Sequence, residues 1–280
     1  MEQRNRAEGW QHAKLSGHEN EKLVKERLDT DAAYAQAFLK RLGMPGEKIQ
    51  KTEIGGLHET NVPSVNGKRK TKSKTDLKIY MESGRVINIS IKKSLGGQVY
   101  FVGASLFIDT FEKQFGRIIP DPVKRGIQLF WAAAKDAVQI IEQHAEKEAE
   151  DNYDLQLRHK SLNATTLKAY NEELHRTLLA WFRDNAYELT KLSFAMGAAR
   201  DQEEWSEYVW YINLLGEHQT DAIFSIEALA KAVAGAAADD TAYSTKNGGT
   251  TILLPFGFVQ WHQKKMQFHH KYAQISKLLS

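Results

Sequence analysis

The chain has 280 residues, of which 42% are hydrophobic and 26% are charged, and its formal net charge is +3. This composition is typical of a globular protein with a substantial core. The absence of cysteine excludes disulfides, thiolate zinc sites and cysteine nucleophiles, and it fits a reducing cytosol. No apolar run is long enough for a membrane span, and the charged N-terminal residues lack the apolar core of a secretory signal. We therefore expect a cytoplasmic protein without a membrane segment.

Residues 10–42 have the apolar spacing of helices. One face of the segment 17–28 carries Leu23, Val24 and Leu28. Glu21 lies on or beside that face, either at the rim of an ordinary amphipathic helix or directed at a functional site. A second helix is predicted over 31–42, because Gly43 and the proline that follows it form a helix-stop pattern.

Residues 46–75 have the composition of a loop, with a tight-turn signal at Asn66-Gly67. The end of this segment carries five cations, namely Lys68, Arg69, Lys70, Lys72 and Lys74. A run of this kind is usually a solvated, flexible loop. Contact with a phosphate backbone is the alternative, and it is favoured because the run directly precedes Asp76.

Residues 75–94 predict two short strands joined by a turn at 82–84. The two-residue period of a strand places Ser90 and Lys92 on the same side. In a hairpin, Asp76 at the near end of the first strand faces the lysine end of the second. A carboxylate beside an ammonium group is suited to holding a divalent metal and a phosphate together.

Two glycines at 96–97 interrupt the strand, and a helix is predicted over 98–115 with Gln98 at its start. Two prolines separate this helix from the segment 123–215, which is predicted to be helical throughout. The aromatic residues of 205–214 have helical spacing, and we expect them in the core rather than in a base-stacking platform.

Strand character returns in the last third of the chain. We expect a strand over 221–226, an alanine-rich helix over 227–238, a polar loop, and a strand with a proline kink over 250–261. Hydrogen-bond donors and aromatic residues then gather up to residue 271. The candidate base contacts are Asn247, Gln260, His262, Gln263, Lys264 and Lys265, since such side chains read base edges. A metal site at His269-His270 is disfavoured because carboxylates and cysteines are missing nearby, and a structural role stays open.

The pair Thr75-Asp76, followed by Ser90-Ile91-Lys92, resembles the motif of the PD-(D/E)xK nuclease superfamily, and within it the Type II restriction endonucleases. The segment 17–28 resembles the first core helix of that family, in which a glutamate can join the metal site. Glu21 occupies the corresponding position. Gln98 resembles a glutamine often found at the start of the next core helix.

The motif departs from the family pattern at two positions. Thr75 replaces a proline that has no chemical role. Ser90 replaces the second carboxylate and is a poor metal ligand, so either another carboxylate substitutes for it or catalysis is lost. Glu21 is the leading substitute, and Glu53 and Glu59 are weaker ones.

The resemblance implies an α/β fold, with the central mixed sheet of the restriction-endonuclease-like core, flanking helices and a large helical insertion. Residues 1–120 would carry the active site and 121–216 the helical region. Residues 217–280 would complete the core and contribute to DNA recognition, and we expect the three parts to form one compact domain.

The implied function is a Mg²⁺-dependent endonuclease that hydrolyses double-stranded DNA, a Type II enzyme of a bacterial or archaeal restriction–modification system. Cleavage of both strands implies a homodimer. Asp76 and Glu21 would bind Mg²⁺ and Lys92 would assist the attacking water, while Lys93, on the other side of the strand, and the basic run would contact DNA. A repair, transposition or defence nuclease of the same fold stays open, as does a non-catalytic nucleic-acid-binding module in which Ser90 marks a decayed site.

Overall fold

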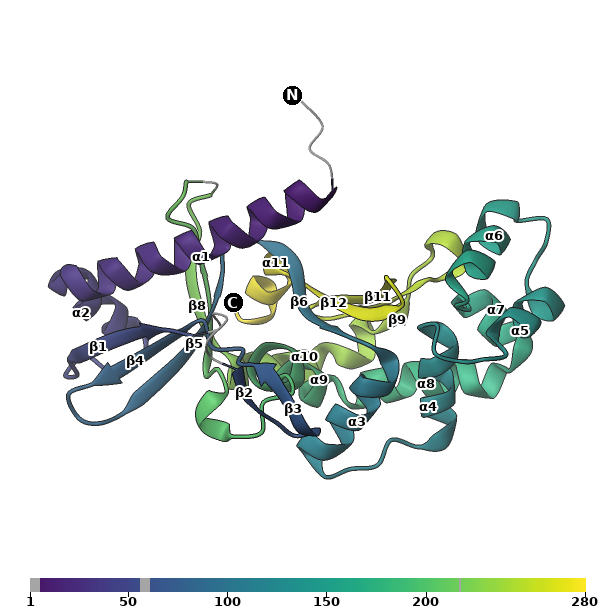
Figure 1. The fold of residues 1–280 in the computed structure, drawn as a ribbon, viewed down its shortest axis with the longest axis horizontal. Helices are drawn as coiled ribbons and strands as arrows, with labels where there is room; N and C mark the ends of the chain where they lie inside the picture. The colour runs from purple at the N-terminus through teal and green to yellow at the C-terminus, as the bar shows by residue number, and fades with distance from the viewer. Residues whose placement is uncertain (1–5, 56–60, 217) are drawn as a thin grey trace. The chain divides into compact units, whose positions relative to one another are not determined.

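The computed structural model describes residues 6–55, 61–216 and 218–280, with side chains from Gly17 onward except those of Lys68 and Arg69. The chain divides into two compact units (Figure 1). Unit 1 comprises Met1–Ser64, Lys68–Leu95 and Ala199–Ile226. Unit 2 comprises Val65–Gly67, Gly96–Ala198 and Glu227–Ser280. Within the described ranges, no helix combines the length and the apolarity needed to cross a bilayer.

A five-stranded mixed sheet forms the centre of unit 1. Its strands, in order across the sheet, are β1 (Ile49–Ile54), β4 (Leu77–Met81), β5 (Val86–Lys92), β7 (Tyr208–Ile212) and β8 (Asp221–Ser225). β5 and β7 run parallel, and the other neighbours run antiparallel. The mixed α/β fold predicted from the sequence is confirmed.

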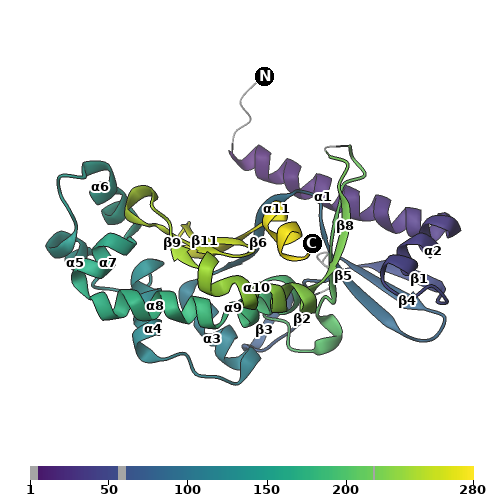
Figure 2. The ribbon, with the colours of Figure 1, turned by 180° about the vertical axis from the view of Figure 1, so that it is seen from behind.

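Two helices, α1 (Arg6–Thr30) and α2 (Ala32–Arg41), lie along one side of this sheet in both views (Figures 1 and 2). Their apolar residues share one buried cluster with those of the sheet, including Val24, Leu28, Phe38, Leu39, Leu77, Ile79, Ile87, Ile89 and Trp210. Each such side chain contributes about 1.5–3 kcal/mol when it is fully buried. The predicted helix over 31–42 is confirmed, with Asp31 accepting a 2.9 Å hydrogen bond from the Tyr34 amide as its N-cap.

Unit 2 contains a second, antiparallel sheet and most of the helices. The strand order is β6 (Gly96–Val102), β12 (Lys265–Lys271), β11 (Gly257–His262), β10 (Thr251–Leu254) and β9 (Ala242–Tyr243). The helices are α3 (Ala104–Phe115), α4 (Asp121–Phe130), α5 (Ala137–His144), α6 (Glu150–His159), α7 (Ala164–Tyr170), α8 (Glu172–Asp184), α9 (Ala186–Lys191), α10 (Ile226–Asp240) and α11 (Tyr272–Leu278). Phe107, Phe111, Trp131 and Phe182 are fully buried in this unit.

The segment 46–75 is not the loop that its composition predicts. It contains β1 and a two-stranded sheet of β2 (Asn61–Ser64) and β3 (Gly67–Lys72), so most of the basic run lies in a strand. The predicted turn at Asn66-Gly67 joins these strands, with Gly67 at φ +85°. Edge strands carry charged residues, and β1 is an edge strand, which explains its loop-like composition.

Three further predictions of secondary structure are wrong. Gln98 lies in β6, opposite His269, and the helix begins only at Ala104. The segment 205–214 contains the strand β7 rather than a helix. The residues before it, which are predicted to be helical throughout, form several shorter helices. The kinked strand over 250–261 is instead the antiparallel pair β10 and β11. β7 is buried along most of its length, so it lacks the alternation that would separate it from a helix.

Candidate active site

The hairpin of β4 and β5 fixes Asp76 at the end of the central sheet. The strands pair about Ser83-Gly84, as predicted, and Gly84 has φ +88°. Asp76 lies just before β4, and its amide donates a 2.8 Å hydrogen bond to the Ile89 carbonyl. Its Oδ2 accepts a 2.7 Å hydrogen bond from the Ile91 amide. Both the backbone and the carboxylate of Asp76 are therefore held by β5.

Ser90 and Lys92 lie on the same side of β5 and form a chain of hydrogen bonds to this carboxylate. Lys92 Nζ donates to Ser90 Oγ at 2.6 Å, and Ser90 Oγ donates to Asp76 Oδ2 at 3.1 Å. Lys92 Nζ also donates to the Ile91 carbonyl at 3.3 Å and lies 3.8 Å from Asp76 Oδ2. The serine hydroxyl therefore bridges the lysine and the aspartate.

Helix α1, which precedes the hairpin in the sequence, brings Glu21 close to Asp76 and Lys92. Its side chain is only 13% exposed, and its Oε2 lies 3.1 Å from His18 Nδ1. Burial, and next the negative charge of Asp76, raise the pKa of Glu21 to about 8, while Lys92 acts in the opposite direction. Glu21 and Asp76 thus form a pair of interacting carboxyl groups beside an ammonium group.

A buried asparagine anchors α1 next to Glu21. Asn20 Nδ2 donates to the Ile212 carbonyl at 2.9 Å, and its Oδ1 accepts from the Leu214 amide at 2.8 Å. Sequence reasoning missed Asn20 and His18. The available signal was an asparagine inside a helix, where asparagine is unfavourable. Its presence there therefore suggests a specific partner for its side chain.

The backbone that carries Asp76 is held by a close contact with Gly55. The Gly55 amide donates to the Asp76 carbonyl at 2.9 Å. A Cβ atom at this position would lie 2.3 Å from the Thr75 carbonyl oxygen, so only glycine allows the approach.

Thr75 has a role that the proline of the family motif could not have. Its amide donates to Ser73 Oγ at 3.0 Å, and its Oγ1 donates to the Glu204 carbonyl at 3.1 Å. A proline has neither donor. Thr75, which replaces a proline without a chemical role in the motif that it resembles, therefore anchors the start of β4.

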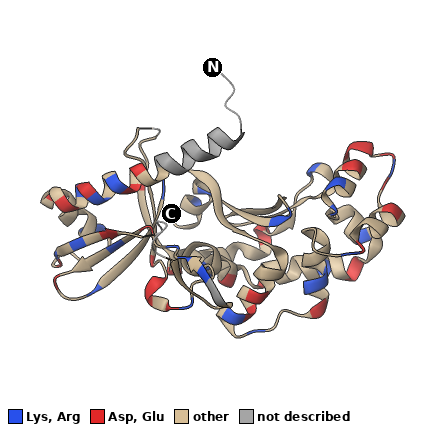
Figure 3. Ribbon diagram, viewed as in Figure 1, with Lys and Arg blue, Asp and Glu red and all other residues tan. Residues whose placement is uncertain are grey.

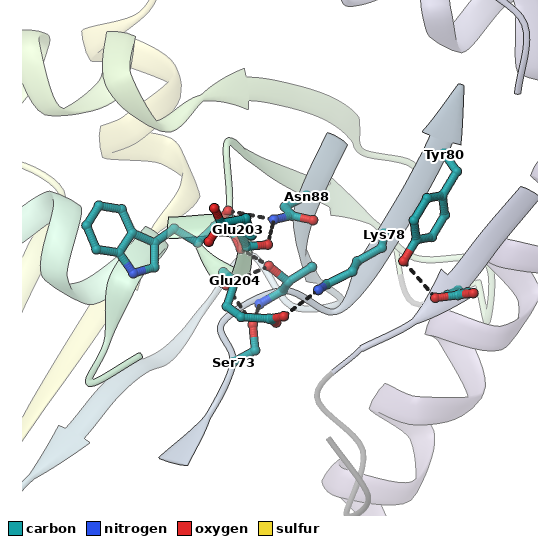
Figure 4. Close-up of polar contacts among 10 residues, drawn as sticks. Ser73, Lys78, Tyr80, Asn88, Glu203 and Glu204 are labelled. Atoms are coloured by element: carbon teal, nitrogen blue, oxygen red, sulfur yellow. Dashed lines mark hydrogen bonds and ion pairs between the residues drawn. The ribbon is translucent and has the colours of Figure 1, made fainter. Parts of the chain in front are cut away.

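The segment that receives these bonds also binds the hairpin on the side shown in Figure 4. Lys78 Nζ pairs with Glu204 Oε1 at 2.7 Å, and Asn88 Nδ2 donates to the Glu203 carbonyl at 2.7 Å. Ser73 Oγ donates to the Glu204 carbonyl at 2.7 Å. These contacts fix the hairpin that carries the site.

The two weaker candidates for the missing carboxylate do not join the pair. Glu53 is exposed, and it accepts hydrogen bonds from Lys51 at 2.6 Å and from Tyr80 at 2.8 Å. These two donors hold its pKa below the usual range. Glu59 lies outside the described residues.

The residues of the basic run differ from one another. Lys74 is half-buried beside the site: burial and the charge of Lys92 lower its pKa to about 7, and Asp76 opposes this shift. Lys70 and Lys72 are exposed, and Lys93 is half-buried after β5. The side chains of Lys68 and Arg69 lie outside the described residues.

The remaining candidates belong to unit 2. Gln98, Gln260, His262 and Lys265 lie on its sheet, and Gln263 and Lys264 form the turn between β11 and β12. Asn247 lies in a short 3₁₀ segment, where its carbonyl accepts a 3.2 Å hydrogen bond from Asn163.

The donor set of unit 1 fits Mg²⁺. Mg²⁺ is usually bound by one or two carboxylates, with water and substrate phosphates completing its coordination. Asp76 and Glu21 supply two carboxylates, and no cluster of three or more His, Asp or Glu occurs in the part of the chain that the structure describes. Within that part, Asp76 Oδ1 accepts no hydrogen bond. A cation would relieve the repulsion between the two carboxylates.

Comparison with known proteins gives a distant structural match. No family model and no curated protein matches the chain. A matching solved structure is that of the restriction endonuclease MspI in complex with its cognate DNA, with a TM-score of 0.47 and 12% identity. The match covers 87% of this chain and 81% of that chain. At this TM-score and identity, the likeness carries no inference about function, which has to come from the residues of the site.

Proposed function

We propose that this chain is a Mg²⁺-dependent nuclease that hydrolyses phosphodiester bonds of double-stranded DNA. The observation that carries the proposal is the carboxylate pair of Asp76 and Glu21 beside Lys92. A buried carboxyl group next to a second one is suited to a divalent cation, and an adjacent ammonium group is suited to a phosphate.

In this proposal Asp76 and Glu21 hold the ion. Bound Mg²⁺ supplies Lewis-acid polarisation of a phosphoryl oxygen and lowers the pKa of a bound water. Lys92 donates a hydrogen bond to the attacking water or to a non-bridging oxygen, which offsets the negative charge that develops at phosphorus. Ser90 orients Lys92 through their 2.6 Å hydrogen bond without adding a negative charge to the site.

We further propose that the enzyme is sequence-specific, of the Type II restriction class, and acts as a homodimer. Cleavage of both strands at a symmetric site requires two active sites, and a two-fold axis supplies them. Repair, transposition or defence nucleases of the same fold share the chemistry of the site but not this specificity.

The neutral Ser90 favours one different function, a nucleic-acid-binding module without catalysis. In that case, Asp76 and Lys92 would serve only as an ion pair that closes the hairpin.

Plasmid cleavage distinguishes these functions. Wild type, Asp76→Ala and Lys92→Ala are incubated with supercoiled plasmid in Mg²⁺ or EDTA, with the exposed Glu19→Gln on α1 as a matched control. Discrete fragments that require Mg²⁺, Asp76 and Lys92 support a sequence-specific enzyme, and a smear supports a non-specific nuclease. Binding without cleavage supports the module, and full cleavage by Asp76→Ala contradicts the assigned site.

A further inference from the structure

The C-terminal part of the chain is strongly cationic. Residues 241–280 contain five lysines and no aspartate or glutamate. This stretch forms β9–β12 and α11 in unit 2. Accordingly, the strands β11 and β12, located by their labels in Figure 1, show no acidic colour in Figure 3. In a chain whose net charge is only +3, a segment with no acidic residue indicates an anionic partner.

Strand alternation gives the unit 2 sheet a polar outward face. On β12, Met266, Phe268 and His270 are buried, while the residues between them are partly or fully exposed. The outward face comprises Gln98 and Phe101 of β6, Phe258, Gln260 and His262 of β11, and Lys265, Gln267, His269 and Lys271 of β12. This face combines amides, rings and cations, which are the groups that contact nucleic acids.

Three glutamine amides are connected across this face. Gln260 Nε2 donates to Gln267 Oε1 at 3.0 Å, and Gln267 Nε2 donates to Gln98 Oε1 at 2.9 Å. The bonds link neighbouring strands, so the amides are oriented before any partner binds. Oriented side chains lose less conformational entropy on binding than free ones.

Two lysines of the face lie over aromatic rings. Lys265 Nζ lies 4.7 Å from the centre of the Phe101 ring, and Lys271 Nζ lies 5.3 Å from that of Phe258. Across the described residues, neither lysine forms an ion pair with a carboxylate. The rings therefore position the cations without neutralising them.

The turn between β11 and β12 holds two side chains in a strained backbone. His262 pairs with Lys265, so the loop has two residues, Gln263 and Lys264, with φ of +48° and +59°. Two-residue hairpin loops with both φ positive strongly favour Asn-Gly, because other residues are strained there. Both side chains are exposed, so packing does not explain them. Strain retained at exposed positions points to a function of the side chains.

We propose that the β11–β12 hairpin inserts its turn into the major groove of duplex DNA, where Gln263 and Lys264 contact base edges. The major groove admits a two-stranded β-ribbon, and glutamine and lysine form hydrogen bonds there to adenine and guanine. The lysines of the outward face lie along the phosphates. This inference rests on the proposed function in one respect, namely that the anionic partner is DNA.

The test uses the double variant Gln263→Asn/Lys264→Gly in the full chain. Because Asn-Gly suits the turn, the variant should melt about 2–4 °C higher than wild type. Its affinity for a mixed-sequence 30-bp duplex, measured by fluorescence anisotropy in EDTA, should fall about tenfold or more. The slope of log affinity against log salt should stay close to that of wild type, because the turn contacts base edges and the variant keeps the lysines of the outward face that lie along the phosphates.

Two further variants control for charge and for turn shape. Lys231→Ala removes one lysine from unit 2 at a position that is 71% exposed on α10, and it should bind like wild type. Lys264→Arg keeps a cationic donor at the turn that also forms hydrogen bonds to guanine, and it should lose less affinity than the double variant. Wild-type affinity in the double variant, an equal loss in Lys231→Ala, or a lower melting temperature of the double variant overturns the inference.

Failure of this inference and failure of the proposed function give different results. A wild-type protein that binds duplex DNA through the turn but does not cleave plasmid in Mg²⁺ contradicts the nuclease and supports the hairpin. A wild-type protein that cleaves plasmid, with a double variant that binds and cleaves equally well, contradicts the hairpin alone.

Discussion

Replacing Glu21 by glutamine should stabilise the metal-free protein at neutral and alkaline pH, although it removes a proposed metal ligand. The glutamine side chain has nearly the shape of the protonated acid and never ionises. Wild-type Glu21, by contrast, ionises freely in the unfolded chain above pH 4.5, whereas in the folded chain burial and Asp76 raise its pKa to about 8, with Lys92 opposing the shift. Ionisation therefore favours the unfolded state of wild type and leaves the variant unaffected.

The direction and the size follow from linkage between protonation and folding. The pKa of Glu21 is about 8 in the folded protein, against an ordinary value of 4.5. The folded state binds the proton more tightly, so the free energy of unfolding is highest below pH 4.5 and falls as the pH rises to about 8. Each pKa unit corresponds to about 1.4 kcal/mol, so the loss reaches about 3 kcal/mol at pH 7 and about 5 kcal/mol above pH 8.

Urea unfolding followed by tryptophan fluorescence in EDTA, between pH 5 and pH 8.5, measures this difference. The free energy of unfolding of Glu21→Gln should exceed that of wild type by no more than about 1 kcal/mol at pH 5 and increasingly toward pH 8. The exposed Glu19→Gln should follow wild type throughout. Added Mg²⁺ should raise the unfolding free energy of wild type more than that of Glu21→Gln, because only wild type offers both carboxylates.

Parallel stability curves for wild type and Glu21→Gln would refute the reasoning, since Glu21 would then ionise as readily in the folded chain as in the unfolded one. In that case the carboxylate pair would not exist, and Ser90 would leave Asp76 as a lone ligand.

Four other substitutions test the supports of the site and the ion pairs. Lys92→Ala should lower the cleavage rate at least about 100-fold in single-turnover assays, with little change in DNA affinity; an unchanged rate contradicts its role. Gly55→Ala places a Cβ 2.3 Å from the Thr75 carbonyl oxygen. The free energy of unfolding in urea should fall by about 2–4 kcal/mol, and cleavage should be reduced. A variant as stable as wild type contradicts the close contact. Asn20→Ala removes two hydrogen bonds of a buried side chain, so the free energy of unfolding should fall by about 2–3 kcal/mol. Mg²⁺ binding, measured by calorimetry, should weaken as well. An unchanged Mg²⁺ affinity would show that the Asn20 anchor does not position Glu21. Glu227 has a pKa of about 2, mainly because Tyr187 and Lys191 donate hydrogen bonds to it. Glu227 is 43% exposed, so above pH 4.5 it should stabilise the wild type by only about 1 kcal/mol relative to Glu227→Gln. In thermal melts this stability difference should disappear as the pH falls toward 2. A stability difference that does not change with pH contradicts the lowered pKa.

The local part of the site could be predicted because its residues are close in sequence. The spacing of Asp76, Ser90 and Lys92 suffices once the hairpin is recognised, since strand alternation decides which side chains share a side. The structure also brings Glu21 near them, while its role as a metal ligand stays a prediction.

The supports of the site could not be predicted in the same way. The partners of Asn20 are backbone groups of Ile212 and Leu214, about 190 residues away, in a segment whose aromatic spacing predicts a helix. β7 is buried along most of its length, so composition alone does not separate a strand from a helix there. The two glycines before Gln98 predict the start of a helix, although Val99, Tyr100 and Phe101 favour the strand that the structure shows.

The parallel pairing of β5 with β7 has a consequence for the synthesis of the protein. A nascent chain that ends shortly after Lys92 can form the hairpin, with Asp76, Ser90 and Lys92 in place. It lacks the Ile212 and Leu214 backbone groups that anchor Asn20, so Glu21 has no fixed position. The ribosome adds about 5–20 residues per second, and the roughly 120 residues between these points take about 6–24 s. In an unfinished chain, Lys92 and Asp76 are therefore in place before Glu21 is fixed beside them, so the complete candidate site forms only when synthesis is well advanced.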